Sequence, residues 1–147
     1  MALKLLFKVL NMNESFGNIK ILCVEDDMFL SSLICKKLGE LGATLFVADN
    51  GERALEIVKN EMPNVVLLDI LLPGMDGFEI LEKIKTNKQT SHIAVVVLSN
   101  LSQKSDIEKG MKLGASKYLV KATVSLDEIV GEIQDVLQPR DKLNRRI

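Results

Sequence analysis

An α/β domain with a parallel sheet is the fold class that the sequence predicts, and three observations predict it. Short apolar runs recur five times along the chain, several of them rich in β-branched residues, as in strands buried on both faces. Between successive runs, apolar residues follow the spacing of one helix face. Capping and turn residues separate the two kinds of segment. Strands that alternate with helices in this way imply a parallel sheet covered on both faces.

The first expected strand is Lys20–Val24, and the first expected helix is Met28–Leu41. Apolar residues repeat along this helix at helical spacing. Gly42 follows it at the position where a positive φ is common. The second expected strand, Thr44–Ala48, comes directly afterwards.

The second expected helix is Glu52–Asn60, and Pro63 lies just past its end. The third strand, Val65–Asp69, is the clearest buried run of the chain. The third helix, Phe78–Lys85, begins after Asp76, which precedes an acidic residue by three positions, as in a capping box.

The fourth strand is Ala94–Ser99, and the more polar fourth helix is Ser102–Leu113. The fifth strand is Lys117–Val120. The fifth helix, Leu126–Leu137, follows Ser125, and Ser125 with the acid three residues later forms a second capping-box pattern.

Composition narrows the class of protein. The chain has 147 residues, which suits one domain, and 47% of them are hydrophobic, enough for a full core. A net charge of -1, 4% aromatic residues and no Trp argue against a nucleic-acid partner. Cys23 and Cys35 lack metal-binding spacing and are expected to be free thiols in a reducing, cytoplasmic compartment. No apolar run approaches the about 20 residues of a membrane span.

Carboxylates stand at the ends of two expected strands. Glu25 and Asp26 follow the first strand, and Asp69 ends the third. In open α/β sheets, ligands bind at the carboxyl ends of the strands. If these ends are neighbours, the acids form a site for a hard divalent cation and offer one carboxylate as a nucleophile.

Two further polar residues end the fourth and fifth strands, Ser99 and Lys121. Together with the acids they supply the groups needed for phosphoryl transfer to a carboxylate. Asp69 would attack phosphorus, and Mg²⁺ held by Asp26 and Asp69 would neutralise the transferring oxygens. Ser99 would donate a hydrogen bond to one phosphoryl oxygen, and Lys121 would pair with another.

Four segments carry a resemblance to a known family: Ile21–Asp27, Leu67–Gly77, Val97–Ser99 and Tyr118–Lys121. In this order and at this spacing they closely resemble the receiver domains of two-component response regulators. The resemblance implies one flavodoxin-like (βα)5 domain whose five-stranded parallel sheet has the order 2-1-3-4-5, with helices on both faces. It covers residues 18–138, which leaves 1–17 as an N-terminal extension and 139–147 as a C-terminal tail. Apolar residues in the extension are expected to need cover, by the domain or by a second copy in a homodimer.

The resemblance also assigns a metal site and a phosphoacceptor. Asp69 is the implied phosphoacceptor, and the implied cofactor is Mg²⁺ or Mn²⁺. Asp26 and Asp69 would bind the ion directly, Glu25 through water, and the backbone carbonyl of Leu71 would be a further ligand. Asp27 is expected to cap the first helix.

A conformational switch is implied as well, with Ser99 as its hydroxyl, Tyr118 as its aromatic residue and Lys121 as the lysine that pairs with the phosphate. Asn100 stands where a smaller residue is usual, so it is expected to crowd the phosphate site. Ala122 stands where the family commonly has proline after a cis bond, and a cis bond before a non-proline residue costs about 2.5–4 kcal/mol.

The expected partners are a sensor histidine kinase or phosphotransfer protein, as phosphoryl donor, and a downstream protein that the sequence does not identify. Such a domain catalyses only its own phosphorylation and dephosphorylation. Leu71 and Leu101 are apolar where some relatives carry polar groups that help water attack the acyl phosphate, so a long-lived phosphorylated state is expected. The expected output face comprises the fourth helix, fifth strand and fifth helix.

Three other classes are weighed against this one. A pseudo-receiver that only binds partners predicts a broken acidic pocket, whereas the acids here are intact. A phosphatase with an aspartate nucleophile needs a second acid two residues later, where this chain has Leu71. A flavin or nucleotide site needs a glycine- or hydroxyl-rich loop after the first strand, and the acids there would repel phosphate.

Overall fold

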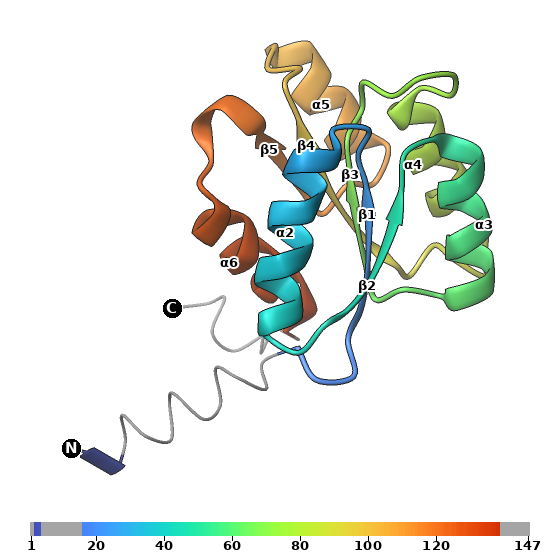
Figure 1. Cartoon of the computed structure of the whole chain (residues 1–147). Coiled ribbons are helices and arrows are strands. Elements are labelled where there is room, and N and C mark those ends of the chain that lie inside the picture. Colours follow the sequence, from blue (N-terminus) through green and yellow to red (C-terminus); the bar gives the residue numbers. More distant parts are fainter. Residues whose placement is uncertain (1, 4–15, 139–147) are drawn as a thin grey trace, which may run out of the picture.

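The computed structural model describes residues 2–3 and 16–138, and a five-stranded parallel sheet lies at its centre (Figure 1). The strand order is β2-β1-β3-β4-β5, which confirms the predicted flavodoxin-like sheet. Neighbouring strands all pair in parallel. The strands are β1 (Lys20–Val24), β2 (Thr44–Ala48), β3 (Val65–Leu68), β4 (Ala94–Ser99) and β5 (Lys117–Val120).

Helices cover both faces of the sheet, so three layers are visible (Figure 1). They are α2 (Met28–Glu40), α3 (Gly51–Glu61), α4 (Gly77–Thr86), α5 (Lys104–Lys112) and α6 (Leu126–Leu137), with a short 3₁₀ helix, η1 (Lys121–Thr123), after β5. The helices α2 and α6 lie on one face, and α3, α4 and α5 on the other (Figure 1).

Each face has its own hydrophobic core, because successive side chains of a strand point to opposite faces. On the first face, Ile34 and Leu38 of α2 and Ile133 of α6 pack against Cys23 and Leu67 of the sheet. The second core draws on the other side chains of the same strands, together with α3 and α4. All four residues of β3 are buried, as the apolar run predicted.

Capping side chains and positive-φ glycines mark several element ends, and Gly42 and Ser125 act as the sequence predicted. Asn50 caps α3 by accepting a hydrogen bond from the backbone N–H of Arg53, and Ser125 caps α6 by accepting one from Glu128. Gly42 and Gly114 have φ values of 98° and 109°, which L side chains rarely adopt.

Two boundaries differ from the prediction in a way that matters for the site. The strand β3 ends at Leu68, so Asp69 lies just beyond the ladder instead of ending it. The helix α5 begins at Lys104 rather than Ser102, and Gln103 before it makes no side-chain cap. The loop after β4 is therefore longer than predicted.

The packed body includes Phe16, two residues before the predicted domain start at residue 18. Its side chain is 0% exposed, and its backbone N–H donates to the carbonyl of Leu41 over 3.1 Å. The expectations for residues 4–15 and 139–147 fall outside the described residues. Among the helices that are described, none is long and apolar enough to cross a membrane.

Candidate functional site

Parallel pairing brings the carboxyl ends of β1 and β3 together. Val24 is the register partner of Leu68, so the next residues, Glu25 and Asp69, leave the sheet side by side. The backbone N–H of Asp69 donates to the carbonyl of Val24 over 3.0 Å. The two strand ends are therefore held at one edge by backbone hydrogen bonds.

Three carboxylates meet at this edge. Glu25, Asp26 and Asp69 each place an oxygen within 4.8 Å of the others. Glu25 is 2% and Asp69 4% exposed, whereas Asp26 is exposed to solvent. Carboxylate oxygens are the donors that Mg²⁺ and Mn²⁺ prefer, and one open side leaves room for water or phosphate oxygens. The donor set fits a hard divalent cation.

Lys121 crosses the site and bridges two of the acids. Its Nζ lies 2.7 Å from Oε2 of Glu25 and 2.8 Å from Oδ2 of Asp69. The lysine starts η1, directly after β5, so the far strand of the sheet supplies the cation. The lysine partly neutralises the two buried carboxylates.

Burial and pairing shift two pKa values in the site. Burial raises the pKa of Glu25, and hydrogen bonds from Lys121 and Asp27 oppose that rise without cancelling it. Burial alone would lower the pKa of Lys121, but hydrogen bonds to Asp69 and Glu25 raise it above the ordinary value. Lys121 is therefore charged at neutral pH.

The loop after Asp69 is fitted closely around it. The other carboxylate oxygen of Asp69, Oδ1, accepts a hydrogen bond from the backbone N–H of Leu71 over 3.2 Å. A Cβ at Gly77 would meet the carbonyl oxygen of Asp69 at 2.5 Å. Gly77 thus lets the start of α4 approach the backbone of Asp69, a role that sequence reasoning missed although the residue stands inside the motif Leu67–Gly77.

Ser99 and Tyr118 both bond to the backbone of Leu101, in the loop after β4. The Oγ of the fully buried Ser99 accepts from the N–H of Leu101 over 3.2 Å, and the Tyr118 hydroxyl donates to its carbonyl over 2.7 Å. Burial, and after it the charge of Asp106, raises the pKa of Tyr118. The two predicted switch residues are therefore connected through one loop residue.

A glycine that the sequence reasoning did not single out makes room for Tyr118. A Cβ at Gly110 of α5 would lie 2.8 Å from Cδ2 of the Tyr118 ring. A glycine inside a helical pattern often marks a close approach, and that signal could have identified it.

Three other residues that the sequence analysis singled out lie around the site. Asp27 caps α2 by accepting hydrogen bonds from the backbone N–H groups of Phe29 and Leu30, which confirms the expected cap. The side chain of Asn100 is exposed. The described residues contain no cis peptide bond, so the bond from Lys121 to Ala122 is trans.

Comparison with known proteins gives a consistent result. The family model of the response regulator receiver domain matches residues 21–134. Sporulation initiation phosphotransferase F of Bacillus subtilis is 35% identical over 120 residues, which are 82% of this chain and 94% of that protein. Probable transcriptional regulator ycf27 of Porphyridium aerugineum is 34% identical over 123 residues, 84% of this chain and 50% of that protein. The chain spans about half the length of that relative.

A solved structure, the Mn²⁺-bound form of response regulator Rcp1, is 30% identical with a TM-score of 0.69, and the match covers 80% of this chain and 91% of that one. Fold, strand-end acids and family match therefore agree, and the predicted resemblance is confirmed. The chain belongs to the receiver domains of two-component response regulators, a family of signalling domains.

Proposed function

We propose that this receiver accepts one phosphoryl group on Asp69, in a reaction that requires Mg²⁺ or Mn²⁺. The observation that carries the proposal is the cluster of Glu25, Asp26 and Asp69 within 4.8 Å, with Lys121 bridging two of them. A bound divalent cation would be held by these acids, with the backbone carbonyl of Leu71 as a further proposed ligand, and would neutralise charge on the transferring phosphoryl group.

In the proposed reaction, an oxygen of Asp69 attacks the phosphorus of a phosphohistidine on a kinase or phosphotransfer protein. A P–O bond forms and the P–N bond breaks, and the imidazole leaves with its electron pair and takes up a proton. Lys121 exchanges its contact with Asp69 for one with a phosphoryl oxygen, because its ammonium already lies 2.8 Å from the carboxylate that becomes the acyl phosphate.

The direct test is intact mass after incubation with a small phosphodonor and Mg²⁺, repeated with a phosphotransfer protein as donor. The wild-type chain is expected to gain one phosphoryl group. Asp69→Asn should abolish the adduct, while Asp49→Asn, which changes an exposed acid outside the cluster, should leave it unchanged. If no donor shifts the wild-type mass, the alternative of a pseudo-receiver that only binds partners replaces this proposal.

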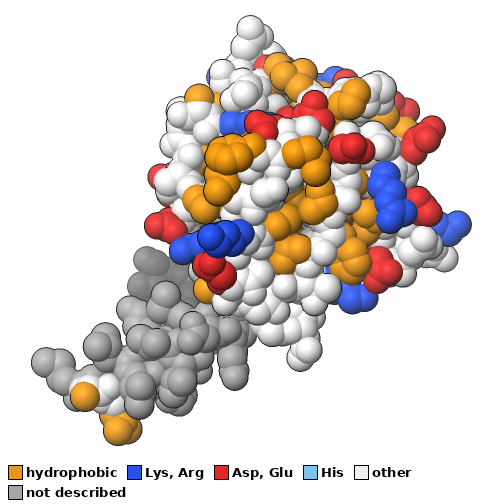
Figure 2. All heavy atoms as spheres, viewed as in Figure 1, with side chains coloured by type: hydrophobic (Ala, Val, Ile, Leu, Met, Phe, Trp, Pro, Cys, Tyr) orange, Lys and Arg blue, Asp and Glu red, His pale blue; other side chains and the backbone are white. Residues whose placement is uncertain are grey.

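The helix α2 is the proposed docking surface for the phosphoryl donor. Three large apolar side chains on it are exposed, Met28 by 61%, Phe29 by 75% and Leu33 by 41%. Figure 2 shows hydrophobic side chains gathered on this face, with acidic side chains just above them. An apolar groove of about 180 Å³ lies between Leu33, Lys121 and α6. A donor seated here would bring its histidine to the acidic edge.

The docking surface is tested by comparing two donors. Phe29→Ala should slow phosphorylation by a phosphotransfer protein at least tenfold and leave the rate with a small phosphodonor unchanged, because only the protein needs the surface. Val47→Ala removes another exposed apolar side chain, on β2, and serves as control. Equal slowing with both donors would show that Phe29 affects the phosphoryl transfer step itself and not the docking of the donor protein.

Phosphorylation is proposed to move Ser99 toward Asp69 and to turn Tyr118 inward. Both residues now bond to Leu101, so a new hydrogen bond from Ser99 to the phosphoryl group would pull on the same loop that holds the Tyr118 hydroxyl. The proposed output face is α5, β5 and α6. Crystal structures with and without beryllofluoride test this step, and identical Ser99 and Tyr118 positions in both would rule it out.

A further inference from the structure

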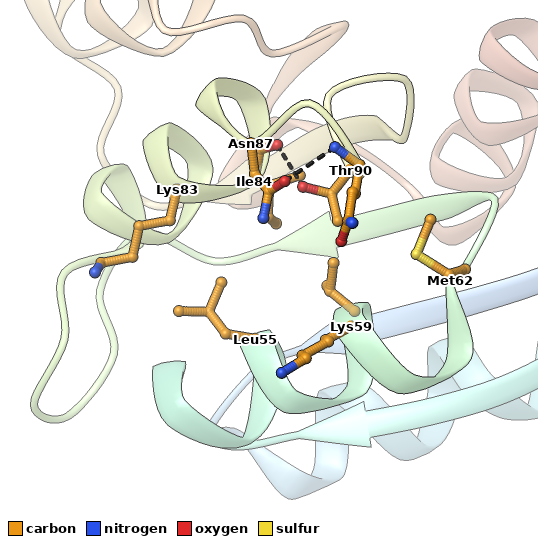
Figure 3. A pocket seen from close by; sticks show the side chains of 9 residues that line it. Leu55, Lys59, Met62, Lys83, Ile84, Asn87 and Thr90 are labelled. Carbon is orange, nitrogen blue, oxygen red and sulfur yellow. Dashed lines mark hydrogen bonds between the residues drawn. The ribbon is translucent and has the colours of Figure 1, made fainter.

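A second surface feature lies at the other end of the sheet, away from the acidic cluster and Lys121. It is a groove of about 430 Å³ between the C-terminal halves of α3 and α4 (Figure 3). These halves lead into the starts of β3 and β4, whereas Asp69 follows the end of β3. The volume falls within the range of about 300–1,000 Å³ that is typical of ligand sites.

The floor of the groove is apolar. Leu55, Val58 and Met62 come from the α3 side and Ile84 from α4. Met62 has a φ of 48°, and its side chain is 40% exposed although it is large and hydrophobic. A flexible methionine at an apolar surface adapts readily to the shape of a bound side chain.

Two lysines flank this floor from opposite walls. Figure 3 shows Lys59 on α3 and Lys83 on α4, with Leu55 between them. Within the described part of the chain, neither lysine forms an ion pair. Both lysines stand in the last turn of a helix, where a cation interacts favourably with the helix dipole. That interaction still leaves the ammonium groups able to donate hydrogen bonds to a ligand.

The charged side chains that line the groove are both cationic, Lys59 and Lys83. On α3 outside the lining, Glu56 pairs with Arg53 and Glu61 with Lys20. The amide oxygen of Asn87 accepts the backbone N–H of Gln89, so this side chain also offers mainly donors to the groove. The two lysines beside the apolar floor therefore favour a ligand that carries hydrogen-bond acceptors with negative charge.

We propose that the α3–α4 groove binds an acidic amphipathic segment of a partner protein. Its apolar side chains would fill the floor, and its carboxylates would pair with Lys59 and Lys83, as in helix-in-groove recognition. The chain's own ends are poorly suited as ligand, because residues 1–15 have two lysines against one acid and residues 139–147 four basic residues against one acid. Charge complementarity thus points to another protein.

The test is a selection from a displayed library of random 12-residue peptides against the wild-type chain. Enriched peptides should combine aliphatic or aromatic residues at i, i+4 spacing with an excess of Asp and Glu. With ¹⁵N-labelled protein, they should shift the backbone amides of the groove residues and leave those around Asp69 unchanged.

Charge reversal supplies the specificity control. Lys59→Glu with Lys83→Glu should weaken the selected peptides at least tenfold, and Lys59→Gln with Lys83→Gln should weaken them less. Lys104→Glu with Lys112→Glu reverses two exposed lysines on α5, outside both the groove and α2, and should not weaken the selected peptides. Thermal melting checks that each variant is folded. Phosphorylation of Asp69 is measured separately, so a failure of peptide binding and a failure of the proposed function can be told apart.

Three results would overturn the inference: no peptide is enriched, the enriched peptides lack an acidic excess, or they bind the double Lys→Glu variant as tightly as the wild type. Binding that shifts amides on α2 instead would assign the peptides to the proposed donor surface.

Discussion

At the scale of single residues, the acidic cluster is expected to set the response of the fold to metal. Glu25, Asp26 and Asp69 repel one another, and Lys121 offsets only part of this repulsion. Mg²⁺ at about ten times its dissociation constant should add about 1.4 kcal/mol to the free energy of unfolding, because it binds the native state alone. Urea unfolding with and without Mg²⁺ measures this difference.

Asp26→Asn is the matched variant for that measurement. It should remove most of the Mg²⁺ effect and raise the metal-free melting temperature, because one repelling charge is lost. Asp127→Asn, an exposed acid on α6, should keep the full Mg²⁺ effect. A wild-type melting curve that does not respond to millimolar Mg²⁺ would contradict the metal site.

The two cysteines give a second prediction at this scale. A hydrogen bond from Cys23 lowers the pKa of the half-buried Cys35 to about 7, against the opposing effect of burial. The alkylation rate of Cys35 should therefore rise with pH through about 7, as the reactive thiolate forms. Cys23 is buried and its pKa is raised, first by its hydrogen bond with Cys35, so it should react far more slowly.

Peptide mapping after iodoacetamide treatment at several pH values measures both rates. Cys35→Ser should abolish the fast reaction. A midpoint near the ordinary thiol pKa of about 8.5 would show that the hydrogen bond between the thiols does not persist in solution.

At the scale of elements, α5 packs closely against β5 because residue 110 of α5 is a glycine and leaves room for the Tyr118 ring. Gly110→Ala would place a Cβ 2.8 Å from the Tyr118 ring, so the ring must move and strain its hydrogen bond to Leu101. Such overpacking costs about 1–3 kcal/mol, against a gain of about 1 kcal/mol in helix propensity. We expect Gly110→Ala to be neutral to destabilising by about 2 kcal/mol and to shift the Tyr118 ring resonances.

Gly131→Ala in α6 is the control, because the added Cβ would meet no atom within 4 Å apart from its chain neighbours and the backbone of its own helix. Here only helix propensity acts, and the variant should be more stable by about 0.5–1 kcal/mol. Equal stabilisation by both substitutions, measured by urea unfolding, would contradict the contact between Gly110 and Tyr118.

At the scale of the whole molecule, the start of the independently folding unit can be tested by truncation. A chain that begins at Met12 retains Phe16, so it should match the full chain in stability, Mg²⁺ binding and phosphorylation. A chain that begins at Asn18 lacks this fully buried ring and should lose about 3–5 kcal/mol, the usual cost of removing a core Phe. Loss of phosphorylation in the Met12 chain would show that the domain begins earlier.

Much of this architecture is encoded locally. The apolar runs, the capping residue Ser125 and the turn glycine Gly42 each act over a few residues. Periodicity and turn chemistry therefore predicted the five strands and the five α-helices that cover the sheet in the described part of the chain. The position of the acids at strand ends was also predictable, because parallel strands bring their carboxyl ends to one edge. That the first and third strands are neighbours was implied only by the family resemblance and is shown by the strand order.

Other features depend on contacts between residues far apart in the chain, which no local pattern specifies. Lys121 and Asp69 are separated by 52 positions, and only the packed sheet lets one ammonium bridge both buried acids. The burial of Phe16 and the cationic groove between α3 and α4 likewise arise from how finished elements pack. The sequence by itself determined the elements and the chemistry at the strand ends. The tertiary structure decided which charges meet and which stay free, because burial and pairing exist only once the layers are assembled.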